Sequence, residues 1–147
     1  MYITDKIAYI NLTSHPLQFA YAGANEIKEY REHDFIVPVD ETINVRWQDT
    51  IKEEIAGVKV IARKPVIDDT TKIAIESTMQ KYIKGIPEGR IGLIFVSLPT
   101  LTALKEIGYP ISGENYRIGT VVVATDRKLT DENGRKVIYA SAYMIAQ

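Results

Sequence analysis

Three polar residues at alternate positions near the start of the chain have the types and spacing that ligand contact requires: Asn11, Thr13 and His15. Residues 7–13 alternate as a strand does, so an extended backbone would place the three side chains on one face. Tyr9 lies at the same parity and would add an aromatic ring. Two interpretations remain open. The group lines a ligand pocket, or it is the solvated face of a strand that ends in a turn.

His15 is one of two histidines in the chain and could serve as a general acid or base. The sequence identifies no partner that would orient its ring. His33 lies in the charged run 26–34 and is expected to be exposed. With no cysteine and no H-E-x-x-H spacing, we expect no metal site and no cofactor. Binding is therefore favoured over catalysis.

Arg46, Trp47 and Ser97 are further candidates for ligand contact. Arg46 points away from the core side of a predicted strand over 43–48, and a guanidinium beside a tryptophan suits a phosphate or a base. More often, an arginine in this position is simply a surface residue. Ser97 follows a strand and begins a helix, where it would act as an N-cap or mark an anion site. No glycine-rich phosphate motif and no G-x-S-x-G elbow is present, which argues against the enzyme classes that use them.

The segment 91–108 is the clearest structural unit among those that must position these residues. Residues 91–96 are apolar on both faces, as in an interior strand. Ser97 then predicts a helix N-cap, Pro99 suits its first turn, and Gly108 suits the position after its end.

Periodicity predicts the other elements. Ile75, Met79, Tyr82, Ile83 and Ile86 share a helical face. This spacing favours a helix over 68–84, with Asp69 as its cap, although residues 72–76 alone could also form a strand. Pro38 makes the run over 35–39 either an edge strand or the end of a strand. Turns are predicted at 23–25 and 131–135, a loop or short helix at 26–34, and a loop at 109–118. Further strands are predicted over 17–21, 58–63, 120–125 and 137–146.

These elements predict one α+β domain over residues 1–147. It has a mostly antiparallel sheet of roughly seven strands with two helices on one side. The formal net charge of −1 provides no general attraction to long nucleic acid or to an anionic membrane. No signal peptide or long apolar run is seen, so a cytoplasmic protein without a membrane anchor is expected.

Residues 11–16, N-L-T-S-H-P, resemble the N-L-T-P-H signature near the start of a group of small phage and prophage proteins. Residues 36–46 look like the short strand pair of that group. Residues 85–89 with 94–97 look like its Gly-Leu-Pro turn and I-V-S strand end, and 133–135 like its last hairpin. Ser14 replaces the usual proline. The arginine–aspartate–proline cluster of the group is replaced by a different loop over 108–118, which removes the basis for a ligand role there.

The resemblance implies an accessory protein in the cytoplasm of an infected or lysogenic host cell, of a kind that counters host defence. We therefore predict a non-enzymatic sponge that binds and sequesters a small phosphorylated nucleotide-type ligand. Pairing of exposed sheet edges could make it a homo-oligomer with a shared pocket. One alternative is a small hydrolase or nuclease with His15 as acid or base, and another is a virion accessory or protein-interaction module. The predicted ligand contacts are Tyr9, Asn11, Thr13, His15, Arg46, Trp47 and Ser97.

Overall fold

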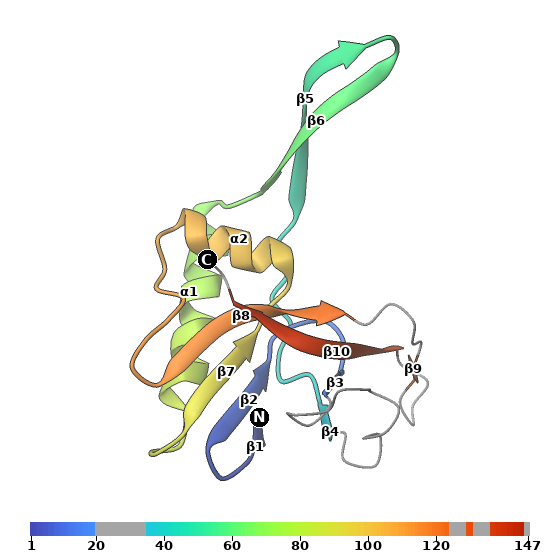
Figure 1. Ribbon diagram of the computed structural model, residues 1–147. Helices are drawn as coiled ribbons and strands as arrows, with labels where there is room; N and C mark the ends of the chain where they lie inside the picture. The colour runs from blue at the N-terminus through green and yellow to red at the C-terminus, as the bar shows by residue number, and fades with distance from the viewer. Residues whose placement is uncertain (20–34, 124–128, 131–135, 146–147) are drawn as a thin grey trace.

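The computed structural model describes residues 1–19, 35–123, 129–130 and 136–145 (Figure 1). The turns expected at 23–25 and 131–135 and the run 26–34 with His33 lie outside these residues. The elements in chain order are β1 (Tyr2–Ile3), β2 (Ile7–Asn11), β3 (Leu17–Phe19), β4 (Phe35–Val37), β5 (Trp47–Ile55), β6 (Val58–Pro65), α1 (Asp69–Lys84), β7 (Ile91–Phe95), α2 (Leu98–Glu106), β8 (Tyr116–Val123), β9 (Leu129–Thr130) and β10 (Lys136–Ile145).

The fold is α+β, as predicted, but its strands do not form one sheet of seven. A mixed sheet has the order β1-β2-β7-β8-β10-β3-β4, with β9 paired to β10, and β5 and β6 form a separate two-stranded sheet. The centre of the mixed sheet is parallel, because β7 pairs in parallel with both β2 and β8. Helix α2 supplies the crossover between β7 and β8, which a parallel pair requires. The predicted mostly antiparallel arrangement is therefore wrong at the centre of the sheet.

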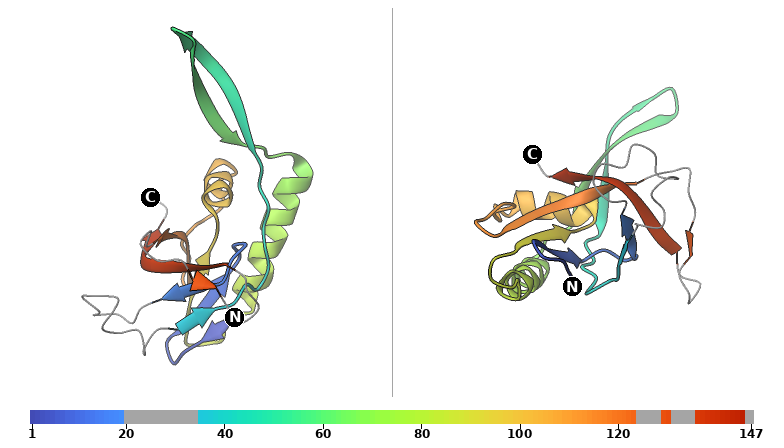
Figure 2. Two further views of the ribbon diagram at one scale, coloured as in Figure 1. Left: turned by 90° about the vertical axis from the view of Figure 1, so that its right-hand side faces the viewer. Right: turned by 60° about the horizontal axis from the view of Figure 1, so that its bottom comes forward.

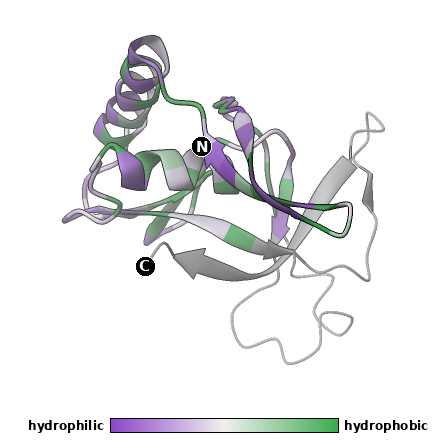
Figure 3. Ribbon diagram, turned by 90° about the horizontal axis from the view of Figure 1, so that it is seen from above, coloured by the Kyte–Doolittle hydropathy of each residue, from purple (hydrophilic) through white to green (hydrophobic). Residues whose placement is uncertain are grey.

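Both helices pack against the same face of the mixed sheet, as predicted. The buried cluster on this face joins β2, β7 and β8 to one side of each helix (Figure 2). Most of the remaining surface of α1 is hydrophilic (Figure 3). The fully buried residues that carry this core are Ala8, Ile10, Leu12, Ile75, Met79, Ile94, Val96, Ala103, Leu104 and Ile118.

The mixed sheet curls, so its own strands cover the face opposite to the helices. A second buried cluster consists of Tyr9, Leu17, Val37 and Phe95. Strand β4 ends the strand order, as predicted for an edge, yet its end lies beside β2. The Asn11 side chain donates to the Val37 carbonyl at 3.2 Å, and the Asp40 N–H donates to the Asn11 carbonyl at 2.9 Å. These bonds join the two ends of the curled sheet.

Helix α2 forms where its sequence predicts it. The Thr100 N–H donates to the Ser97 hydroxyl at 3.5 Å, and a proline lies in the first turn. Gly108 follows the last turn with φ of 73°, a conformation that glycine adopts without strain. The predicted start and end of this helix are confirmed.

Helix α1 is also confirmed, but Asp68 rather than Asp69 is its N-cap. The Thr71 N–H donates to the Asp68 carboxylate at 2.7 Å. Asp69 already belongs to the first turn of the helix, where its charge only favours the helix dipole. The hydrogen bond from the Thr71 N–H, and then that from its hydroxyl, lowers the pKa of Asp68.

Replacing Asp68 with alanine should lower Tm by about 2 to 4 °C, because α1 loses the acceptor for an otherwise unpaired N–H. Asp69→Ala is the matched control and should leave Tm nearly unchanged. Thermal unfolding followed by circular dichroism measures both. Equal losses in the two variants would contradict the assignment of the cap.

Two further predicted boundaries are wrong. Residues 43–46 are not a strand, because the Ile43 N–H bonds to the Leu12 carbonyl at 3.4 Å and the segment joins no ladder. Apolar residues alternate in this segment because Ile43 and Val45 both pack against the core between the mixed sheet and the helices. Strand β8 begins at Tyr116, inside the predicted loop 109–118. Its pairing with β7, rather than local composition, determines where it starts.

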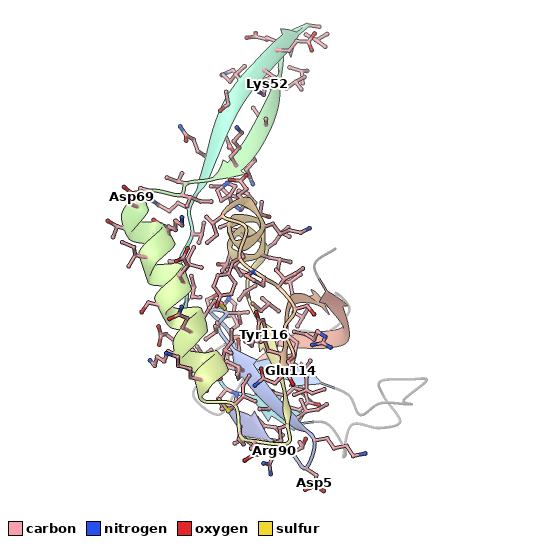
Figure 4. All side chains as sticks on the ribbon, turned by 90° about the vertical axis from the view of Figure 1, so that its left-hand side faces the viewer. Asp5, Lys52, Asp69, Arg90, Glu114 and Tyr116 are labelled. Atoms are coloured by element: carbon pink, nitrogen blue, oxygen red, sulfur yellow. The ribbon has the colours of Figure 1, made fainter. Side chains whose placement is uncertain are left out.

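Strands β5 and β6 form an arm, Trp47–Pro65, that projects far from the rest of the molecule (Figures 1 and 2). Its tip is a tight turn in which Ala56 and Gly57 have φ of 49° and 84°, as type I′ hairpins require. The strand predicted over 58–63 is confirmed as β6, whereas the strand predicted over 43–48 overlaps β5 only at Trp47 and Gln48. Figure 4 shows side chains along both faces of the arm, around Lys52, with no other element against them.

Candidate functional site

The polar motif at the end of β2 is a closed turn. Asn11 is fully buried, and its amide donates to the carbonyl oxygens of His15 at 2.9 Å and Val37 at 3.2 Å. Its Oδ1 accepts the Thr13 N–H at 3.0 Å. The polar atoms of Asn11 are thus occupied by the chain itself.

Thr13 and His15 belong to the same turn rather than to a continued strand. The Thr13 hydroxyl lies 2.6 Å from Asn11 Oδ1 and 3.0 Å from the His15 carbonyl oxygen, to one of which it donates. Strand β2 ends at Asn11, so the expected row of three side chains on an extended backbone is not formed. The turn uses the backbone carbonyl of His15. The side chain of His15 is half-buried.

The other predicted contacts are spread over the molecule. Ser97 caps α2 at the carboxyl end of β7, the same sheet edge as the Asn11 turn. Tyr9 faces the opposite cluster, where its ring lies parallel to that of Phe95 with centroids 6.4 Å apart. Arg46, exposed, and Trp47, half-buried, lie at the base of the arm. The structure therefore brings together only part of the predicted set.

The segment 40–45 crosses the sheet edge at which β2 and β7 end. The Thr42 hydroxyl donates to the Thr13 carbonyl at 3.1 Å, and the Thr100 hydroxyl to the Ile43 carbonyl at 3.5 Å. A groove of about 290 Å³ lies between this segment and the first half of α1. We call it the threonine groove, and its lining residues are Glu41, Thr42, Ile43, Asn44, Thr70, Thr71, Ala74, Ile75 and Thr78.

Glu41 sets the charge of this groove. Its carboxylate accepts from Lys81 Nζ at 2.9 Å, from the Tyr82 hydroxyl at 3.2 Å and from the Thr78 hydroxyl at 3.3 Å. The Lys81 hydrogen bond is the main cause that lowers the pKa of Glu41. Burial, followed by the Glu41 charge, raises the pKa of Tyr82. The Glu41 carboxylate can also accept from hydroxyl or amine groups of a ligand, while its pair with Lys81 balances its charge.

The Glu41 pairings predict a pH dependence of stability. A carboxyl whose pKa is lowered on folding stabilises the protein above its unfolded value of 4.5, and this contribution is lost as pH falls through the folded pKa. Glu41→Gln should therefore reduce the loss of stability between about pH 5 and pH 3. Glu53→Gln, on the exposed arm, is the control. Urea midpoints across this pH range measure the effect, and identical profiles for Glu41→Gln and the parent would refute it.

The chemistry available in the groove is hydrogen bonding. It contains hydroxyls, one amide and one carboxylate, and the carboxylate of Glu41 already accepts from the Thr78 hydroxyl at 3.3 Å. Nowhere in residues 1–19, 35–123, 129–130 and 136–145 do three His, Cys, Asp or Glu side chains gather as metal ligands would. No helix in the same residues is long and apolar enough to cross a membrane.

The fold and these surfaces define a class: an α+β protein with a curled mixed sheet, a groove beside α1 and a long projecting arm (Figure 1). Comparison with family models, curated proteins and solved structures found no match.

Sequence analysis missed two features of the structure, the arm and the role of segment 40–45. The arm had a usable signal, because Ala56-Gly57 separates two runs of β-forming residues as a hairpin turn does. The role of segment 40–45 had none. Its position depends on hydrogen bonds to Leu12 and Thr13, almost thirty residues earlier in the chain.

Proposed function

We propose that this chain is a non-catalytic protein-interaction module that docks through its arm. The observation that carries the proposal is the apolar surface of the arm. Ile51, Ile55 and Val58 are 56%, 55% and 65% exposed. Such residues in β-strands are normally covered, and sheet edges that carry them are normally protected.

An isolated two-stranded ribbon is marginally stable in water, so the length of this arm is itself informative. Its strands have nine and eight residues, yet beyond its base it packs against no other described element. The Arg63–Asp49 pair at 2.7 Å is half exposed and adds little stability. A partner laid against the arm would supply the missing apolar burial.

The resemblance of residues 11–16 to small phage and prophage proteins supports a setting for this proposal. It is that of an accessory protein in the cytoplasm of an infected or lysogenic cell. A docking arm on a small body suits a virion accessory or an inhibitor of a host protein, with no turnover required.

The test is affinity recovery of the tagged full chain from the cells that produce it. The proposal expects one stoichiometric protein, its own chain or another, that Val58→Lys no longer retains. Ile73→Lys is a matched control, because Ile73 on α1 is 67% exposed and Val58 65%. Recovery of no stoichiometric protein, or equal recovery by Val58→Lys, would overturn the proposal.

A second candidate function is the sequestration of a small nucleotide-type ligand, and the threonine groove is the observation that favours it. Its volume is near the lower limit of small-molecule sites. Its threonine hydroxyls and the Glu41 carboxylate can form hydrogen bonds with the hydroxyl groups of a ribose. The ligand contacts would then be groove residues rather than Asn11 and Thr13.

Incubation with a panel of linear and cyclic nucleotides, followed by washing, denaturation and mass spectrometry, tests this candidate. An intact ligand that Thr71→Val fails to retain would support sequestration in the groove. An altered ligand would support the hydrolase alternative, with His15→Ala as the next variant. If nothing is retained or altered, both small-molecule functions are excluded for that panel.

A further inference from the structure

We infer that an extended, acidic segment of a partner protein adds to the arm as a further strand, along the outer edge of β6. This inference rests on the proposed function, because it states how the arm docks and which chemistry it accepts. Among the described residues the arm is a sheet of two strands only, so each strand has one outer edge. Such an edge carries backbone N–H and C=O groups that can form a ladder with another strand.

Both faces of the arm carry exposed apolar side chains. Residues directly opposite each other in an antiparallel pair lie on the same face, and successive residues alternate between faces. The register therefore places Ile51 and Ile61 on one face, and it places Ile55 and Val58 on the other. A surface laid against one face would leave the other in water. An added strand turns its side chains alternately to both faces, so it extends the apolar contacts on each.

The two outer edges of the arm are not equivalent. The register of the ladder shifts between Ile51 and Glu53, so β5 contains one extra residue, Lys52, as a β-bulge. Bulges and lysines on an edge are devices that oppose the addition of another strand. The register gives β6 no extra residue between Val58 and Lys64. The edge of β6 is thus the regular one, and we assign the added strand to it.

The charge of β6 determines which kind of segment fits its edge. The strand has two lysines and one arginine and no carboxylate. Arg63 is paired with Asp49 of β5. Lys59 and Lys64 are exposed, and no carboxylate of the described residues lies within ion-pair distance of either. Opposite charges stabilise neighbouring strands and like charges destabilise them, so carboxylates separated by apolar residues suit this edge.

The test uses a synthetic peptide as long as β5, in which glutamate alternates with valine or threonine, titrated into the purified full chain. The peptide should bind, and a matched peptide with lysine in place of glutamate should not. In the complex the outward-facing N–H groups of β6 gain hydrogen-bond partners. Their hydrogen exchange, measured residue by residue by NMR, should therefore slow, while the outward-facing N–H groups of β5 should keep their rates.

Side-chain variants test the role of charge. Lys59→Gln combined with Lys64→Gln should weaken binding of the acidic peptide about five- to tenfold, because two opposite-charge contacts across the ladder are lost. Lys52→Gln is the matched control, since Lys52 is also an exposed lysine of the arm but lies on the bulged strand. It should bind the peptide as tightly as the parent. Circular dichroism verifies that the variants are folded.

Separate outcomes distinguish this inference from the proposed function. An acidic peptide that binds no more tightly than its lysine counterpart, or that protects N–H groups elsewhere than on β6, overturns the inference. Equal weakening by Lys52→Gln also overturns it. The docking arm would still stand if Val58→Lys abolished recovery of a stoichiometric protein from cells. Absence of both the peptide complex and an arm-dependent protein overturns the inference and the proposed function together.

Discussion

Asn11→Ala should lower the free energy of unfolding by about 3 to 5 kcal/mol, among the largest single effects that we expect in this chain. The substitution removes the amide that donates to the carbonyls of His15 and Val37 and the oxygen that accepts from the Thr13 N–H. It also removes the side chain that joins β2 to β4 where the curled sheet meets itself. Chemical denaturation with linear extrapolation measures the loss.

Asn44→Ala is the control for this prediction, because Asn44 is exposed and lies outside any strand. It should change stability by less than about 0.5 kcal/mol. If Asn11→Ala were as stable as the parent but lost a bound nucleotide, the ligand role first predicted for Asn11 would be supported and the structural role rejected.

Gly92→Val should destabilise the protein by about 3 kcal/mol through overpacking at the centre of the sheet. A Cβ at Gly92 would lie 2.3 Å from the Cδ1 and 2.9 Å from the Cγ1 of Ile86, whose side chain is itself buried. Because β7 is paired on both sides, the backbone has little room to move. The free energy of unfolding by urea measures the loss.

A double-mutant cycle tests the proposed cause. In an Ile86→Ala background the contact is gone, so Gly92→Val should cost at least about 1 kcal/mol less than it does alone. Gly85→Ala is the matched control, since a Cβ there makes only ordinary contacts of 3.5 to 3.7 Å. Equal costs of Gly92→Val in the two backgrounds would show that Ile86 is not the obstacle.

The phage resemblance and the structure give the N-L-T-S-H motif different meanings. The resemblance implies a ligand-binding accessory protein, whereas the geometry gives Asn11 and Thr13 a clear structural task. A motif that is shared because it stabilises the same turn indicates a similar fold and says nothing about function. We therefore propose the arm and the threonine groove, not this motif, as the places to test for binding.

The sequence alone determined the elements whose signals are local. Helix α2 follows from Ser97, Pro99 and Gly108, because caps and φ preferences act within a few residues. Helix α1 follows from its apolar spacing, and β7 from apolar residues on both faces. Even for α1, the sequence did not determine whether Asp68 or Asp69 is the N-cap, because this depends on the backbone conformation at the two residues.

Tertiary structure alone decided which faces are covered and which strands meet. Alternation at 43–45 and at 58–62 looks the same in sequence, yet the first segment packs on the core without a ladder and the second projects as an arm. Asn11 is buried because the curled sheet returns Val37 to it, twenty-six residues later. Periodicity indicates that a face is apolar, but the group that covers it comes from a distant part of the chain.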